Sequence, residues 1–178
     1  MNRVLVRLFL AFSLLSIAGC ASTSSVVIPA SVGAPSVALI LEGPLGDQAA
    51  DLISQELAVN GIGVVERART RQVIGIDTDL NLASPDAAHS LLNYGQQLGV
   101  QYFFSGTVSA ESGPLYSFPH VNMTLRLIDV RTGQTRWIGR YGNSMWTDAI
   151  SQQGDLQRGS KHIVREFIRA GGPAVLQE

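Results

Sequence analysis

The residues of this chain with the clearest chemistry lie near its start, where Leu15–Cys20 spell Leu-Ser-Ile-Ala-Gly-Cys around the only cysteine. Residues 1–7 carry two arginines and no acid, residues 8–17 are largely apolar, and two small residues precede the thiol. This order is typical of a secretory signal peptide with a small-residue cleavage site. We therefore interpret the segment as a lipobox, and expect Cys20 to carry covalent diacylglycerol and an N-acyl chain after cleavage.

The alternative is a plain secretory signal in which the cysteine is incidental. The apolar run is shorter than the ~20 residues of a membrane-spanning helix, so anchoring depends on the lipid. The residue after the thiol is Ala21 and not Asp. By resemblance to sorted lipoproteins, this favours the periplasmic face of the outer membrane over retention at the inner membrane.

The rest of the sequence shows no pattern typical of catalysis. A catalyst needs a nucleophile beside a base, or converging metal ligands, and the three histidines stand far apart as His89, His120 and His162. The segment Glu42–Gly46 sits where a phosphate-binding loop would, yet it matches neither the dinucleotide fingerprint nor the Walker pattern. We expect no enzyme, no metal and no cofactor apart from the lipid.

The two tryptophans lead to different expectations. Trp137 lies in an apolar strand pattern and is expected in the core. Trp146 lies in a polar stretch, where an exposed indole would suit a lipid headgroup boundary. The alternative for Trp146 is a ring that caps the core at a helix entrance.

Charge and length limit the possible partners and domains. Cleavage removes Arg3 and Arg7 and leaves eleven basic against fourteen acidic residues, so nucleic acid is not an indicated partner. The chain divides into a signal peptide (1–19), a lipidated cysteine with a tether rich in Ser, Ala and Pro (20–36), a globular domain (37–172) and a tail (173–178).

Hydrophobic periodicity predicts the elements that would position these residues. The predicted order is β-α-β-α-α-β-β-β-α, over residues 36–41, 47–60, 62–65, 66–76, 84–98, 102–109, 121–127, 135–141 and 156–168. An initial βαβ unit followed by three consecutive strands predicts a mixed sheet of about five strands with helices packed on it. The fold class is therefore α/β to α+β.

Three stretches resemble the CsgG-like family of envelope lipoproteins. They are Val64–Arg69, Leu98–Val108 and Leu125–Trp137, and together they span most of the chain after the tether. The family shares a fold with the amino-terminal domain of TolB and with LpoB. The resemblance implies a periplasmic domain that acts without catalysis, beside other envelope proteins.

Length separates the branches of this family. A curli-type channel adds about four membrane strands of ~9–11 residues, for which this chain has no room. An activator of a peptidoglycan synthase, like LpoB, needs a long tether, whereas this tether has 16 residues, 21–36. The best resemblance is to PelC-type exopolysaccharide export lipoproteins, which implies a homo-oligomeric ring. An LpoB-like activator, or a curli- or flagellum-associated assembly lipoprotein, is the alternative.

The PelC-type resemblance also implies roles for two residues. The stretch Asn143–Ser151 resembles the segment in which the family carries a membrane-facing tryptophan, which here is Trp146. The family places a carboxylate toward the lumen of its ring from the loop before the hairpin. Residues 112–118 contain no acid, and Glu111 is the nearest substitute.

Overall fold

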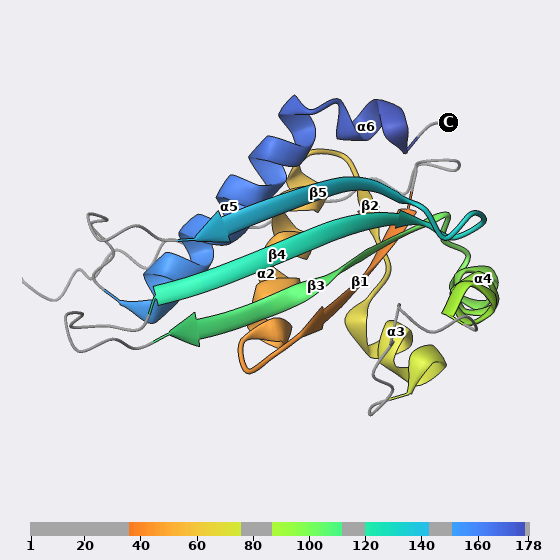
Figure 1. The fold of residues 1–178 in the computed structure, drawn as a ribbon, viewed down its shortest axis with the longest axis horizontal. Coiled ribbons are helices and arrows are strands. Elements are labelled where there is room, and N and C mark those ends of the chain that lie inside the picture. Colours follow the sequence, from red (N-terminus) through yellow and green to blue (C-terminus); the bar gives the residue numbers. More distant parts are fainter. Residues whose placement is uncertain (1–35, 76–86, 112–119, 143–150, 177–178) are drawn as a thin grey trace, which may run out of the picture.

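The computed structural model describes residues 36–75, 87–111, 120–142 and 151–176, which form one mixed sheet with helices packed against it (Figure 1). The elements are β1 (Ser36–Glu42), α2 (Gly46–Val59), β2 (Gly63–Val64), α3 (Arg67–Ile74), α4 (Ala87–Leu98), β3 (Tyr102–Glu111), β4 (His120–Asp129), β5 (Thr135–Gly142), α5 (Gln152–Arg169) and α6 (Gly172–Val175). This order confirms the predicted fold class.

The sheet has the strand order β2-β1-β3-β4-β5. Strand β1 pairs in parallel with both β2 and β3, so that Val37 lies opposite Val64 on one side and Tyr102 on the other. Strands β3, β4 and β5 then pair antiparallel, as the three predicted consecutive strands require. The βαβ unit and the meander therefore join through β1 and β3, which are far apart in sequence.

Helices α2 and α5 cover one face of the sheet (Figure 1). Each presents an apolar stripe to the strands, with Ile53 and Leu57 buried on α2 and Ile163 and Phe167 buried on α5. This layer forms the larger of two cores.

Trp137 belongs to this larger core, as the sequence predicts. Its ring meets Phe104 and Phe167 edge to face, with centroids 6.2 and 5.2 Å apart. Aromatic pairs prefer such edge-on contacts because the ring edge is positive and the ring face negative.

The opposite face of the sheet is covered at one side only. Helices α3 and α4 contact each other, and their buried side chains pack with β1, the start of β3 and the end of β4 in a second core. The start predicted for α4 at Ser84 and Pro85 lies outside the described residues. Beyond this second core, none of the described helices covers the face of β3, β4 and β5 that looks toward the viewer in Figure 1.

The carboxyl-terminal segment differs from the prediction, which placed a tail over residues 173–178. The chain turns at Gly171, whose φ is +80°, and forms the short helix α6. The Tyr102 hydroxyl donates a hydrogen bond of 2.8 Å to the Val175 carbonyl, and Leu176 is buried in the larger core. The packed domain therefore extends past residue 172. The sequence did not predict this, because a single apolar residue after a turn has no periodicity that would indicate its burial.

Candidate functional site

Strand direction brings two chain connections, β3 to β4 and β5 to α5, to one end of the sheet, which we call the loop end. Strand β3 finishes there at Glu111, β4 begins at His120 and β5 finishes at Gly142. Glu111 pairs with His120 in the ladder, and its side chain is exposed. Trp146 follows β5 by four residues but lies outside the described residues, as does Cys20.

A buried carboxylate fastens this end together. Asp155, in the first turn of α5, is only 1% exposed. It accepts a hydrogen bond of 2.6 Å from the Tyr141 hydroxyl at the end of β5, and one of 2.9 Å from the backbone N–H of Val121 at the start of β4. One side chain therefore ties two strands to the helix beneath them.

The environment of Tyr141 follows from this contact. Burial raises the pKa of the phenol above its ordinary value of 10.0, and the hydrogen bond to Asp155 and the negative charge of that carboxylate raise it further. The phenol is thereby held as a neutral donor, which is a positioning role and not that of a base.

The histidines do not converge. His120 lies at the loop end, His162 is exposed on α5 with its ring 5.7 Å from that of Tyr141, and His89 lies in α4. Within residues 36–75, 87–111, 120–142 and 151–176, no three His, Cys, Asp or Glu side chains are grouped so that they could hold a metal ion. The same residues contain no helix with the length and apolarity of a membrane span.

The uncovered face of the sheet is polar and basic. Ladder pairing places Arg126 beside Ser105 and Ile138, and the next row places Thr124 between Thr107 and Arg140. The Ile138 side chain is 54% exposed on the edge strand β5. An edge strand with unpaired backbone groups and an exposed apolar side chain is open to another chain.

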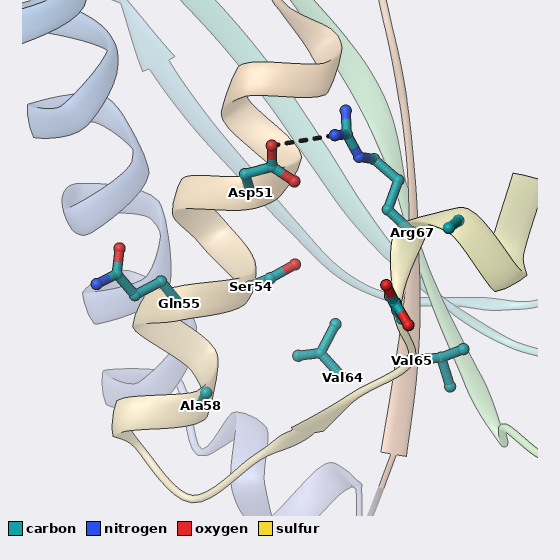
Figure 2. A pocket seen from close by; sticks show the side chains of 9 residues that line it. Asp51, Ser54, Gln55, Ala58, Val64, Val65 and Arg67 are labelled. Atoms are coloured by element: carbon teal, nitrogen blue, oxygen red, sulfur yellow. Dashed lines mark ion pairs between the residues drawn. The ribbon is translucent and has the colours of Figure 1, made fainter. Parts of the chain in front are cut away.

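A hollow of about 410 Å³ opens near β2, at the other edge of the sheet from β5. It lies between α2 and the segment that joins β2 to α3 (Figure 2). Its apolar lining is Ala58, Val64, Val65 and Ala68, and its polar lining is Asp51, Ser54, Gln55, Glu66 and Arg67.

Arg67 holds the rim of this hollow in place. Its guanidinium lies 3.2 Å from an oxygen of Asp51 and 3.2 Å from one of Asp47. Arg71 also donates a hydrogen bond to Asp47. That hydrogen bond, more than the charges of Arg71 and Arg67, lowers the pKa of the Asp47 carboxyl, against a smaller opposing effect of burial.

A larger hollow of about 730 Å³ lies at the other end of the sheet, between the end of α4 and the turn that joins β4 to β5. Arg131, Asp129 and Arg136 line it together with Gln96 and Gln101. The turn itself is held by Asp129, whose carboxylate accepts hydrogen bonds from the backbone N–H groups of Arg131 and Thr132. This is the turn that the sequence predicts.

The sequence did not identify Asp155 and Tyr141. Their partners lie 14 and 34 residues away along the chain, so no local spacing marks them. The one available signal was an acid in the first turn of a helix, which has the simpler explanation of a favourable interaction with the helix dipole.

No protein-family model and no curated protein matches the sequence. Among solved structures, the lipoprotein GNA1162 from Neisseria meningitidis is similar with a TM-score of 0.52 at 16% identity, over 76% of this chain and 97% of that one. The PelC dodecamer from Paraburkholderia phytofirmans gives 0.45 at 17% identity, over 80% and 92%. The LpoB carboxyl-terminal domain from Salmonella enterica gives 0.44 at 16% identity, over 76% and 93%.

Of these structures, GNA1162 has the TM-score that supports a shared fold. At these identities the likeness concerns the arrangement of the chain and not its activity. The chain therefore has the fold of the lipoprotein GNA1162, which confirms at the level of the fold what its motifs predict.

Proposed function

We propose that this chain is an outer-membrane lipoprotein whose periplasmic domain works without catalysis, as one subunit of an oligomeric scaffold for export, and that the exported material is an exopolysaccharide. The observation that carries the proposal is the lipobox at Cys20 joined by a short tether to a domain with the fold of a lipoprotein. The oligomeric ring and the exported polysaccharide are inferred from the resemblance of the motifs to PelC-type proteins.

The length of the tether supports work close to the membrane. Residues 21–36 span about 50 Å when fully extended, and a flexible chain of that length averages about 20–25 Å. A domain held so closely can surround or support a path through the membrane, but it cannot reach a partner at the inner membrane.

The sheet sets a condition for the membrane contact proposed for Trp146. Strands β1 and β5 run in the same direction, so the tether enters at one end of the sheet and the chain leaves β5 at the loop end. The 8 residues of β5 separate these ends by about 26 Å. A tether of this length can bridge that separation, so the lipid on Cys20 and the ring of Trp146 can meet one membrane.

The anchor is tested by membrane fractionation of cells that express the full chain. A Cys20→Ala variant should be lost from the outer membrane, and Cys20→Ser should behave in the same way. Retention of both variants in the outer membrane would contradict a lipid anchor. Trp146→Ala in the lipidated chain should weaken vesicle binding without a loss of thermal stability, and a large loss would place the ring in the core instead.

The scaffold is tested by the mass of the lipidated protein in detergent, from sedimentation velocity. Oligomers larger than a dimer are expected. A monomer at high concentration, together with co-purification of a peptidoglycan synthase, would favour the LpoB-like activator in place of the export scaffold.

A further inference from the structure

The larger hollow, of about 730 Å³, lies between the end of α4 and the turn that joins β4 to β5, and we call it the turn hollow. Its volume is within the range of small-molecule sites, which is roughly 300–1,000 Å³. Its polar lining residues are Gln96, Gln101, Asp129, Arg131, Thr132 and Arg136. The turn hollow therefore has both the room and the polar groups to bind a small molecule.

Backbone hydrogen bonds hold the walls of the turn hollow in place. The Val130 N–H donates a bond of 2.9 Å to the Gln101 carbonyl, which joins the turn to the segment just before β3. The Val100 N–H donates one of 2.9 Å to the Gly95 carbonyl, which joins the same segment to α4. The Asp129 carboxylate fixes the turn itself. A site whose walls are fixed before binding loses less conformational entropy when a ligand arrives.

The turn hollow is positively charged. Arg131 in the turn and Arg136 at the start of β5 both line it, and Asp129 is the only carboxylate among its described lining residues. No carboxylate of the described residues lies within ion-pair distance of the Arg131 guanidinium. The whole chain has a formal net charge of −1, so this positive charge is local. A hollow lined by one sign of charge favours a ligand of the opposite sign.

The uncharged polar groups of the turn hollow suit a ligand with several oxygen atoms. The Thr132 hydroxyl oxygen accepts a hydrogen bond of 3.3 Å from the Gln134 N–H, and its own proton stays available to donate. Gln96 and Gln101 are exposed, and a side-chain amide both donates and accepts hydrogen bonds. Sugar hydroxyls also donate and accept, so they match such amides. A carboxylate matches the planar fork of an arginine.

The apolar part of the lining distinguishes a sugar from a small inorganic anion. Leu92 and Val130 line the turn hollow and also belong to the second core. The C–H face of a sugar ring can cover such apolar surface and remove it from water, which is favourable. Inorganic phosphate has no apolar face and would fill only a small part of the volume.

We propose that the turn hollow binds a sugar acid, which is a saccharide unit with a carboxylate group. Arg131 binds the carboxylate through its guanidinium fork, while Gln96, Gln101 and Thr132 bind ring hydroxyls. The identification of this sugar as part of an exported polysaccharide rests on the proposed function, whereas the site itself does not. The inference therefore names a class of glycan that the scaffold would recognise.

The place of the turn hollow in the domain agrees with this role. The Ser36 hydroxyl at the start of β1 donates a hydrogen bond of 3.3 Å to the carbonyl of Gly99, which lines the hollow. The hollow thus lies at the end of the sheet opposite the loop end (Figure 1). If the loop end contacts the membrane through Trp146, the hollow lies on the periplasmic side, where a glycan would arrive.

The experiment uses the mature, lipidated chain in detergent and measures binding by isothermal titration calorimetry. The probes are trisaccharides of galacturonate and of glucuronate, the methyl ester of each, and inorganic phosphate. The methyl ester keeps the sugar and removes the charge. The variants are Arg131→Ala, Arg131→Lys and Gln101→Ala, and Arg165→Ala on α5 is the matched control for loss of an exposed arginine outside the hollow. Circular dichroism confirms that each variant is folded.

At least one of the two sugar acids should bind saturably, with a Kd below about 1 mM. Its methyl ester and the Arg131→Ala variant should each weaken binding by about tenfold or more, because a charged hydrogen bond is lost. Arg131→Lys should fall between Arg131→Ala and the wild type, because lysine keeps the charge and lacks the fork. Gln101→Ala should weaken binding less than Arg131→Ala, and Arg165→Ala should match the wild type.

Four results would overturn the proposal: no saturable binding of either sugar acid, equal binding of the methyl ester, equal binding of inorganic phosphate, or unchanged binding by Arg131→Ala. Sedimentation of the same protein tests the scaffold function separately. Oligomers that bind no sugar acid would overturn this site and leave the scaffold function standing. A monomer that binds a sugar acid as described would support this site and overturn the scaffold function.

Discussion

Replacement of Asp155 by alanine should be among the most damaging single changes at the loop end. The carboxylate is 1% exposed and accepts hydrogen bonds from the Tyr141 hydroxyl and the Val121 backbone N–H. Alanine leaves both donors without this partner. The Val121 N–H is then trapped in the interior, because Val121 itself is fully buried.

The magnitude follows from the two donors. A buried donor without a partner costs about 1–3 kcal/mol, and the half-buried Tyr141 hydroxyl, which water can reach, costs about 1 kcal/mol. The sum is about 3 kcal/mol of unfolding free energy. For a domain of this size that corresponds to a fall of about 10 °C in Tm.

The assay is urea unfolding followed by circular dichroism at neutral pH, with three reference variants. Asp155→Asn keeps one acceptor oxygen and should lose less than Asp155→Ala. Tyr141→Phe removes one of the two hydrogen bonds and should lose about 1 kcal/mol. Ser151→Ala removes the cap that accepts from the Gly154 N–H at 3.1 Å in the same helical turn, which costs about 1 kcal/mol. The reasoning is refuted if Asp155→Ala loses no more than Ser151→Ala.

Three further outcomes are expected. The pKa of Tyr141 is raised in the folded state, so the contribution of its hydroxyl to stability is present below pH 10 and is lost as the pH rises further. The difference in unfolding free energy between wild type and Tyr141→Phe should therefore shrink above pH 10. A constant difference would count against the contact with Asp155. Gly106→Ala would press a Cβ against the carbonyl oxygen of Thr124 on the neighbouring strand, and a loss of about 2–3 kcal/mol in denaturant unfolding is expected, against a small loss for Gly142→Ala at the strand end. Arg67→Ala removes two ion pairs between exposed groups, so the free energy of unfolding should fall by less than about 1 kcal/mol at low salt and by less still in 1 M salt. A fall of more than about 2 kcal/mol would show that the pairs act as a buried network.

The local elements could be predicted because their signals are local. The pattern of Leu156, Ile163 and Phe167 repeats with the helical period, and the alternation from Val121 to Leu127 repeats with the period of a strand. The Thr-Gly turn before β5 was predictable too, because glycine readily adopts the positive φ that such a turn requires. Gly133 has a φ of +68°. Trp137 was placed in the core on the same grounds.

The candidate sites depend on contacts between residues that are distant in the sequence, and such contacts leave no periodic pattern. The short helix α6 was missed because Leu176 is buried by a turn at Gly171 and not by a repeating pattern. Glu111 was chosen as a substitute carboxylate, and the structure adds only that it is exposed opposite His120. Its role toward a lumen stays a prediction, as do the roles of Cys20 and Trp146, which lie outside the described residues.

The sequence by itself determined the order of the elements and the faces that they bury, because these follow from patterns among neighbouring residues. It also predicts the lipobox and the short tether, which lie outside the described residues. Only the tertiary structure decided that β1 lies between β2 and β3, that Asp155 joins two strands to α5, and that Arg67 of α3 pairs with Asp51 of α2. These features depend on which distant segments pair and in which direction. Packing of the whole domain determines which segments pair, because no single segment specifies its partner.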